Sequence, residues 1–475
     1  MATTARPNVL WLMTDEQRPD SLGCYGTPFA RTPHLDVLAA SGTLCRTALT
    51  PAPVCVAARA ALLTGLRPFA TGVSHNRSKF ASKPRFLTEC FAEAGYATAS
   101  FGKQHYNCPF GRAFAEERLL VLGEAVDYFG YKKGYRHEEF GVVQYPGGPD
   151  SRWVLAGRYP EDAATTPEHG NVDHALAWHE RHARERPETP WLLRVSFNAP
   201  HTPVTAPAPY DGCIDPEAVD AWFARATNPL AGDRPRYETE HLRGDYAGSQ
   251  RLDAAQLHAL RRCYYGCVSF LDAQFGRLLE ALRARGALEN TLIVYLSDHG
   301  AGLGENGLLQ KQSFYEQVVN VPWIWAWPGR IPSGRRIETP VETLSLLPTL
   351  LAFCGLEVPA GLHAPALAED LAAGREPAAR PVCSEHDYGT RNYRTGDRLA
   401  LVRDGTWKLT RFRDPRDKTR FDDDPQGSLY DLAGDPWEQV NRFGDPALQD
   451  VVRELTEKLD ARDREIYGPP RSGSE

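Results

Sequence analysis

Short apolar runs alternate along the chain with longer segments in which apolar residues recur every three or four positions. Runs that are apolar at almost every position are typical of strands buried on both faces of a parallel sheet, and the segments between them predict covering helices. The sequence therefore predicts an α/β fold with a mainly parallel central sheet. The predicted strands are 7–15, 97–103, 191–200, 291–300 and 321–329, and the predicted helices include 32–42, 85–96, 171–185 and 257–285.

The apolar periodicity gives way near residue 368 to a stretch of Ala, Glu, Arg and Pro. Such a change in composition is typical of a boundary between domains. We expect a small C-terminal α+β subdomain beyond it. The predicted division is a large domain over 1–367, a linker over 368–381, the subdomain over 382–467 and a disordered tail over 468–475.

Within the subdomain, two β-rich runs meet at Asp404-Gly405, a pair that predicts a hairpin turn. A helix is expected over 446–466. Two long stretches, 107–168 and 203–251, are rich in Gly, Pro, Tyr and Arg. We expect these stretches to be irregular and to contribute to function, as long irregular segments of compact domains commonly do.

Composition restricts the partners and the setting of the protein. The chain has 475 residues and a net charge of −7, and no block of like charge is long enough to predict nucleic-acid binding. The N-terminus lacks the order of a signal peptide, and no apolar stretch is long enough to cross a membrane. We therefore expect a cytoplasmic protein without a membrane partner. The ten cysteines, which lack regular spacing, are expected to be mainly reduced thiols.

Chemically reactive residues follow four of the five predicted strands. The carboxyl ends of parallel strands meet at one edge of a sheet, where binding sites gather. Taken singly, a strand-end aspartate more often caps a helix, and a loop histidine or lysine is usually solvated. Four such endings together indicate a site. The residues are Asp15 and Glu16 at the end of the first strand, Lys103 and His105 at the end of the second, His201 directly after the third, and Asp298 and His299 at the end of the fourth.

A further candidate is Cys55, which directly precedes an alanine-rich segment with Arg59 four residues later. Alanine favours a helix, and Gly65 is a typical helix end. One interpretation is that Cys55 is an ordinary core residue. The other is that a helix N-terminus, a cysteine and an arginine together form a reactive centre that binds an anion.

The candidate residues at the sheet edge have complementary chemistry. Three carboxylates and one imidazole suit Ca²⁺, Mg²⁺ or Mn²⁺ better than a structural zinc ion. A divalent ion surrounded by cations and proton donors suits hydrolysis of an ester of a tetrahedral oxyanion. The metal-ligand candidates are Asp15, Glu16, Asp298 and His299, and the surrounding cations and proton donors are Arg59, Lys103, His105, His201 and Lys311.

Several stretches in this order carry a family resemblance that spans nearly the whole chain. They include "PNVLWLMTDEQRPDSLGCYG", "CVAARAALLTGLRP", "GYATASFGKQH", "FNAPHTPV", "SDHGAGLGENGLLQKQSFYEQVVNVPWI" and "GSLYDLAGDPWEQVN". The chain resembles the formylglycine-dependent sulfatases of the alkaline phosphatase superfamily. The resemblance implies an alkaline-phosphatase-like α/β/α sandwich and metal-dependent hydrolysis of a sulfate ester through a formylglycine.

In that family, the cysteine of a Cys-x-Pro-x-Arg motif followed by Thr-Gly is oxidised to formylglycine by a maturation enzyme. Cys55, Arg59, Thr64 and Gly65 match the motif, whereas Ala57 stands where proline is usual. The resemblance implies that a maturation enzyme is a partner of this chain. The radical type tolerates alanine at this position, and the oxygen-dependent type prefers proline.

The resemblance also implies roles for individual residues. A hydroxyl of the hydrated aldehyde at residue 55 attacks sulfur, and His201 or Lys311 protonates the leaving alcohol. His105 deprotonates the second hydroxyl, which expels sulfate. Arg59 would hold the diol, and Lys103 and Lys311 the sulfate oxygens. The implied metal ligands are Asp15, Glu16, Cys55, Asp298 and His299, and the implied substrate contacts are Asn76 and His75.

The sequence departs from the common pattern at the metal ligands. Many relatives have Asp-Asp and Asp-Asn where this chain has Asp15-Glu16 and Asp298-His299. The histidine version occurs in choline sulfatases and phosphonate monoester hydrolases. One divalent cation is expected, with Ca²⁺ favoured by the three carboxylates and Mn²⁺ or Mg²⁺ as alternatives.

The expected substrate is a small-molecule sulfate ester of a sugar or aryl alcohol. Two alternatives remain open: a phosphonate monoester or phosphodiester hydrolase that uses the same site, and a non-enzymatic binding protein if Cys55 is not converted. Whether the protein forms a homo-oligomer also remains open.

Overall fold

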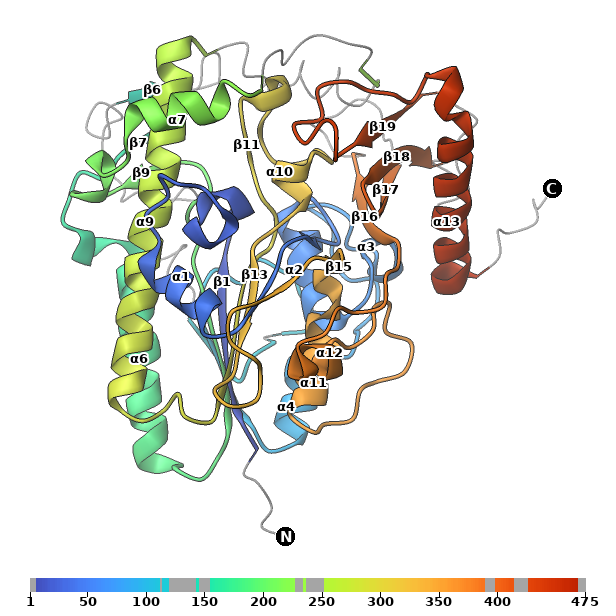
Figure 1. Ribbon diagram of the computed structural model, residues 1–475. Helices are drawn as coiled ribbons and strands as arrows, with labels where there is room; N and C mark the ends of the chain where they lie inside the picture. The colour runs from blue at the N-terminus through green and yellow to red at the C-terminus, as the bar shows by residue number, and fades with distance from the viewer. Residues whose placement is uncertain are drawn as a thin grey trace.

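The centre of the molecule is an eight-stranded sheet in a computed structural model (Figure 1). The structure describes residues 6–111, 113–118, 142–144, 154–226, 234–235, 252–388, 398–413 and 426–468. The strand order is β14-β2-β13-β10-β1-β8-β4-β5. The bounds are β1 Asn8–Thr14, β2 Thr43–Cys45, β4 Ala97–Gly102, β5 Glu116–Arg118, β8 Trp191–Ser196, β10 Thr291–Ser297, β13 Trp323–Ala326 and β14 Arg335–Ile337.

The central strand β1 lies between β10 and β8 and runs parallel to both. Strand β4 extends the parallel arrangement beyond β8. Strand β13, in contrast, is antiparallel to both β10 and β2. The connection from β10 to β13 contains short elements only, and parallel neighbours need a long crossover between opposite sheet edges. The chain therefore re-enters the sheet from the edge at which β10 ended.

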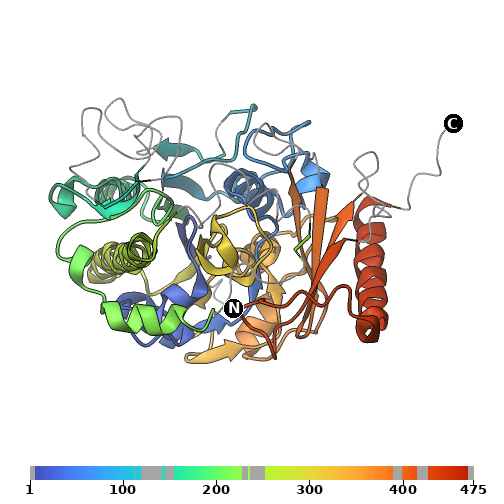
Figure 2. The ribbon, with the colours of Figure 1, turned by 90° about the horizontal axis from the view of Figure 1, so that it is seen from above.

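Helices cover both faces of this sheet in separate layers (Figures 1 and 2). Alternate residues of β1 point to opposite faces: Leu10 and Leu12 belong to one core, and Val9, Trp11 and Met13 belong to the other. The α/β/α sandwich is thereby confirmed. One layer contains α1 Pro33–Ala40, α6 Pro167–Glu185, α7 Pro216–Phe223 and α9 Ala254–Ala284; the other contains α2 Cys55–Thr64, α3 Pro68–Thr71, α4 Leu87–Glu93, α11 Leu346–Phe353 and α12 Ala368–Ala373.

A four-stranded antiparallel sheet forms the C-terminal part, with one long helix against it (Figure 2). The predicted hairpin is present, because Asp404 pairs with Trp407 across a turn in which Gly405 has φ 57°. Leu49 and Phe314 of the main domain share a core with residues of this sheet. The elements are β16 Val382–Asp387, β17 Arg398–Asp404, β18 Trp407–Arg413, β19 Gly427–Asp431 and α13 Gln449–Tyr467.

The remaining short elements form small sheets of two or three strands and the connections around the site. Pairs β11·β12 and β15·β3 are two-stranded, and β6, β7 and β9 form a three-stranded sheet. These elements complete the framework of the described residues. Their bounds are β3 Ala48–Leu49, β6 Val142–Gln144, β7 Val154–Arg158, β9 Val204–Ala206, β11 Gly302–Leu303, β12 Leu309–Gln310, α10 Glu316–Val319 and β15 Val341–Glu342.

Both stretches that were expected to be irregular contain regular elements. Helix α7 begins after Asp215, whose carboxylate accepts a hydrogen bond from the amide of Glu217 at 3.0 Å, and it buries Val219 and Phe223. The helix is short, so its apolar spacing is too brief to stand out in the sequence. Much of the two stretches, at 119–141, 145–153, 227–233 and 236–251, lies outside the described residues, as do residues 469–475 of the predicted tail.

Two further features concern the expected setting of the protein. No helix in the described part of the chain has the length and apolarity needed to cross a membrane. All ten cysteines are unpaired.

The linker predicted over 368–381 contains helix α12, so part of it is regular structure.

Candidate active site

The predicted site residues converge at the carboxyl-terminal edge of the central strands. Asp15 follows β1, Asp298 follows the adjacent β10, and Lys103 follows β4. The amide of Asp298 donates to the carbonyl of Thr14 at 3.3 Å, which keeps the two strand ends in register. Asp15 and Asp298 are fully buried, as is His299. The reactive residues that the sequence places at the ends of separate strands therefore form one cluster.

Cys55 is the first residue of α2 and is fully buried. The segment before it is extended, and Val54 provides no side-chain cap. Asn76 instead accepts a hydrogen bond through Oδ1 from the amide of Val56, at 3.1 Å. The first turn of the helix thus places its positive end beside the Cys55 thiol, an arrangement that favours an anion there.

Four donor atoms, one from each of four residues, lie within 4.8 Å of one another: Asp15, Cys55, Asp298 and His299. His299 Nε2 is 3.2 Å from Cys55 Sγ and 3.8 Å from Asp298 Oδ1. His299 Nδ1 lies 2.9 Å from the carbonyl of Gly300. A proton on Nδ1 donates to that carbonyl, which directs Nε2 at the cluster. Burial lowers the pKa of His299, but Asp298, Cys55 and Asp15 outweigh it and raise that pKa to about 9, so a bound cation would displace the proton on Nε2. Two carboxylates and an imidazole aimed at one point fit a divalent cation.

Arg59 contacts both carboxylates of the cluster. Its Nε donates to Asp298 Oδ2 at 2.7 Å, and its Nη2 lies 3.5 Å from Asp15 Oδ2. Its Nη1 donates to the hydroxyl of Ser196 at 2.9 Å and to the carbonyl of Lys103 at 3.0 Å. All three guanidinium nitrogens have partners, so Arg59 fixes the positions of Asp15 and Asp298 relative to each other. Ser196, at the end of β8, was not among the predicted residues.

Two lysines, Lys103 and Lys311, lie close to residue 55. Lys103 forms an ion pair with Asp15, and its Nζ is 4.0 Å from Cys55 Sγ. Lys311 Nζ lies 3.3 Å from the same sulfur and 2.7 Å from His201 Nε2. The cations that were expected to surround a bound oxyanion are therefore assembled around residue 55.

Glu16 lies outside the cluster of four and contacts Lys311 instead. Its carboxylate forms an ion pair with Lys311, lies 3.5 Å from His201 Nε2, and accepts from the hydroxyl of Thr202 at 3.5 Å. Asp15, Glu16 and His201 form a second group with donor atoms close enough for a metal ion. The expected role of Glu16 as a ligand of the catalytic ion stays a prediction.

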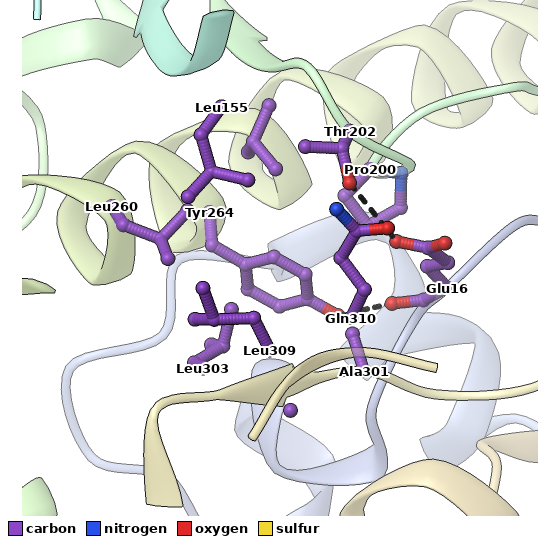
Figure 3. Close-up of a pocket in the computed structure, with 12 residues that line it drawn as sticks. Glu16, Leu155, Pro200, Thr202, Leu260, Tyr264, Ala301, Leu303, Leu309 and Gln310 are labelled. Carbon is purple, nitrogen blue, oxygen red and sulfur yellow. Dashed lines mark hydrogen bonds between the residues drawn. The ribbon is translucent and has the colours of Figure 1, made fainter. Parts of the chain in front are cut away.

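A small, mainly apolar cavity lies beside Glu16 (Figure 3). Leu155, Leu260 and Leu309 line it, and the Tyr264 hydroxyl donates to the carbonyl of Glu16 at 2.6 Å. Glu16 itself has φ 64°, a left-handed conformation that is uncommon for a residue with a side chain. The hydrogen bond from Tyr264 helps to hold this conformation, which directs the carboxylate toward Lys311.

The charges of the cluster shift its protonation equilibria. Burial raises the pKa of the Cys55 thiol, but Lys103, Lys311 and His299 outweigh it and hold that pKa well below the usual value. Burial also raises the pKa of Asp15, as does Cys55, yet the nearby cations keep it below its ordinary range. The site therefore favours negative charge at residue 55.

His105 and His75 differ in their surroundings. His105 hydrogen-bonds Cys55, and burial lowers its pKa. Its Nδ1 is buried and has no hydrogen-bond partner among the described residues. His75 Nδ1 accepts from the amide of Arg77 at 3.1 Å. His105 thus faces residue 55, whereas the side chains of His75 and Asn76 accept hydrogen bonds from backbone amides.

The fold and this cluster define a class of protein: an α/β/α sandwich whose buried acidic, basic and thiol side chains meet at the carboxyl-terminal edge of the sheet, beside a helix N-terminus. Comparison with known families identifies the class further. The Sulfatase family model matches residues 7–356, and the model of the C-terminal region of N-sulphoglucosamine sulphohydrolase matches residues 304–465. The chain belongs to the sulfatase family and is an enzyme of that family.

Individual relatives cover nearly the whole chain. The ulvan-active sulfatase of Formosa agariphila is 28% identical over 97% of this chain and 82% of its own length. The crystal structure of the phosphonate monoester hydrolase of Agrobacterium radiobacter has a TM-score of 0.77 at 23% identity, covering 99% of this chain and all of that one. A protein solved with its substrate D-glucosamine-2-N,6-O-disulfate has a TM-score of 0.71 at 22% identity, covering 97% of this chain and 98% of its own. The two structures confirm the fold.

Proposed function

We propose that this sulfatase hydrolyses the sulfate ester of a sugar with residue 55 as formylglycine and one divalent cation at the site. Asp15, residue 55, Asp298 and His299 would hold the cation. The observation that carries the proposal is the buried cluster of these four residues with Lys103 and Lys311 beside residue 55. The formylglycine hydrate would supply the nucleophilic hydroxyl, and the cation would supply Lewis-acid stabilisation of the anion.

The chain's own charges support binding of an anion once a cation is present. Three carboxylates, Asp15, Glu16 and Asp298, stand against three cations, and these formal charges cancel. A divalent cation would therefore leave an excess of positive charge beside residue 55. Lys103 and the N-terminus of α2 would hold sulfate oxygens from two directions. The three cationic side chains are Arg59, Lys103 and Lys311.

Proton transfer falls to three side chains. Lys311 and His201 lie 2.7 Å apart on one side of residue 55, where either could protonate the leaving alcohol. His105 hydrogen-bonds residue 55 from another side. Because burial lowers its pKa, His105 is neutral near pH 7 and can accept a proton from a hydroxyl of residue 55.

The proposed cation follows from the chemistry of its ligands, and the proposed substrate follows from the names of similar proteins. The carboxylate oxygens favour Ca²⁺, and the histidine nitrogen keeps Mn²⁺ and Mg²⁺ as alternatives. The names of two similar proteins refer to ulvan and to a sulfated glucosamine, which supports a sulfated sugar, and an arylsulfatase of Clostridium perfringens at 27% identity keeps an aryl sulfate as the alternative. Hydrolysis of a phosphonate monoester or phosphodiester by the same residues is the competing function.

The test uses full-length protein co-produced with a radical-type maturation enzyme, because Ala57 replaces the proline that the other type prefers. Mass spectrometry of tryptic peptide 47–59 measures conversion, in which one oxygen replaces sulfur and two hydrogens. Sulfated monosaccharides, an aryl sulfate, an aryl phosphodiester and a phosphonate monoester are then compared at equal metal loading. Faster turnover of a phosphonate or phosphodiester than of every sulfate would overturn the proposal.

A further inference from the structure

Arg194 is a charged residue in the middle of the central sheet. It lies on β8, is fully buried, and is flanked by Leu193 and Val195 in an otherwise apolar run. Its guanidinium stacks over Trp11 at 5.2 Å and over Phe114 at 4.6 Å. Among the described residues no carboxylate forms an ion pair with it, and its Nη1 has no hydrogen-bond partner.

A buried guanidinium that forms no ion pair is unfavourable for folding, because burial removes its hydration and the attraction of Glu117 offsets only part of that cost. Burial lowers the pKa of Arg194 to about 10, and Arg59 contributes to the shift. The side chain is still charged at neutral pH. Methionine or leucine would fill this position at a lower cost in folding free energy. The polar contacts of Arg194 therefore indicate what its charge does.

Those contacts lead to the turn that follows β4. Arg194 Nε donates to the hydroxyl of Ser100 at 2.9 Å, and Nη2 donates to the side-chain carbonyl of Gln104. The amide nitrogen of Gln104 donates to the carbonyl of Gly102 at 3.0 Å. Gln104 stands between Lys103 and His105 in the sequence, so Arg194 holds the residue that joins two members of the active site.

This turn is tightly constrained on its other sides. The amide of Lys103 donates to the carbonyl of Ser196 at 2.7 Å. At Gly102, with φ 95°, an added Cβ would lie 2.0 Å from the Ser196 carbonyl. His105 has φ 48°, a left-handed conformation that is uncommon for a residue with a side chain. The Gln104 side chain closes the turn before it through the carbonyl of Gly102, and Arg194 anchors that side chain.

We propose that Arg194 is a positioning residue, which acts through Gln104 to hold Lys103 and His105 against residue 55. The proposal rests on the proposed function, because it takes Lys103 and His105 to act on the substrate. It assigns a use to a buried charge whose removal should be tolerated by the fold but not by the reaction. That difference separates it from an ordinary structural role.

The experiment compares Arg194→Met, Gln104→Ala and the double variant in matured, metal-loaded enzyme. A displacement of about 1 Å at a catalytic group can cost about 10²-fold in rate. We expect kcat to fall roughly ten- to a hundredfold in each single variant, and the double variant to be no slower than Arg194→Met, because both act through one contact. The Tm of Arg194→Met should be unchanged or higher, since a buried charge that forms no ion pair is replaced by an apolar side chain.

A matched control is Arg413→Met in the C-terminal sheet, where a fully buried arginine pairs with Asp463. This variant leaves a buried carboxylate unpaired, so its Tm should fall while kcat per folded molecule stays unchanged. If Arg194→Met behaves like this control, Arg194 is merely structural. Additive rate losses in the double variant would also overturn the proposal.

Amide hydrogen exchange provides a readout that does not depend on the assigned activity. Exchange of the peptide covering 101–106 should be faster in Arg194→Met and in Gln104→Ala, whereas β10 should be unchanged. Unaltered exchange in 101–106 would overturn the proposal even if activity fell. A wild-type enzyme that turns over no sulfate ester would instead refute the proposed function, and the exchange experiment would still decide whether Arg194 holds the turn.

Discussion

Replacement of Lys311 by alanine tests how the leaving alcohol is protonated. The Lys311 ammonium contacts the carboxylate of Glu16, lies 2.7 Å from His201 Nε2, and lies 3.3 Å from Cys55 Sγ. It is therefore placed to donate a proton on the side of residue 55 at which His201 also stands. In Lys311→Ala, His201 loses this neighbour but keeps its position beside Glu16 at 3.5 Å.

The expected loss depends on the leaving group. General acid catalysis contributes about 10²–10⁴-fold, and His201 can still supply part of it. We expect kcat/KM to fall by about 10²-fold, or about 2.7 kcal/mol, for sulfates of alkyl alcohols and sugars. Esters of acidic phenols, whose oxygen departs without a proton, should lose less than about tenfold.

Stability should also change, because Glu16 remains buried without its ammonium partner. Removing one member of a buried ion pair costs about 3–5 kcal/mol. The lower end applies to Lys311→Ala, since His201 and the Thr202 hydroxyl still face Glu16. Lys408→Ala is the matched control: Lys408 is a buried lysine paired with Glu438 and Glu316 in the C-terminal part. It should lower stability without altering the dependence on leaving group.

The assay measures kcat/KM of wild-type, Lys311→Ala and Lys408→Ala enzymes for aryl sulfates whose phenols span a range of pKa. The plot of log kcat/KM against phenol pKa should become steeper in Lys311→Ala only. An equal loss for every ester would mean that Lys311 binds sulfate oxygens and donates no proton. Unchanged kinetics would refute the reasoning altogether.

Three further predictions follow from the site and the core. Chelation should abolish turnover while far-UV circular dichroism is retained, because the presumed ligands lie at one sheet edge; full activity in verified metal-free protein would contradict the ligand assignment. Thiol-form protein and Cys55→Ala should be nearly inactive, and activity should rise in proportion to the aldehyde in peptide 47–59; equal turnover by the thiol form would rule out formylglycine. Burial lowers the pKa of His179 and of His363 to about 4 from 6.5. The unfolded chain therefore binds protons first as pH falls from 6.5 toward 4, so Tm should fall in that window, and less so in His363→Gln; an unchanged pH profile in that variant would contradict this.

The hydrophobic pattern predicted the sheet and its two covering layers, because strands buried on both faces must be apolar throughout. It could not predict that β13 is antiparallel, since a run such as "WIWA" reads the same in either direction. The strand endings contain a hint. The four predicted strands that lead into reactive residues are the parallel ones, and β13 is the fifth.

Most of the candidate site could be predicted because the residues that follow parallel strands meet at one edge. Asp15, Lys103 and Asp298 are of this kind. Arg194 and Ser196 were missed because they belong to strand β8 itself, and contacts with distant segments decide what such residues do. The one available signal was a single arginine in the apolar run "WLLRVS", a position at which charge is expensive.

The role of Glu16 could not be predicted from its residue type and its position in the sequence. A carboxylate directly after Asp15 was expected to join the same cation, yet its longer side chain reaches Lys311 and His201. The left-handed backbone at Glu16 and the hydrogen bond from Tyr264 to its carbonyl set that direction, and Tyr264 lies 248 residues away in sequence. A contact of that range leaves no local pattern. Tertiary structure therefore decides whether Glu16 is a metal ligand or a partner of the proton donor. The variant Glu16→Gln separates the two roles. If Glu16 is a ligand, the variant should bind less metal, whereas if it is a partner of Lys311, the variant should hydrolyse esters of poor leaving groups more slowly at full metal content.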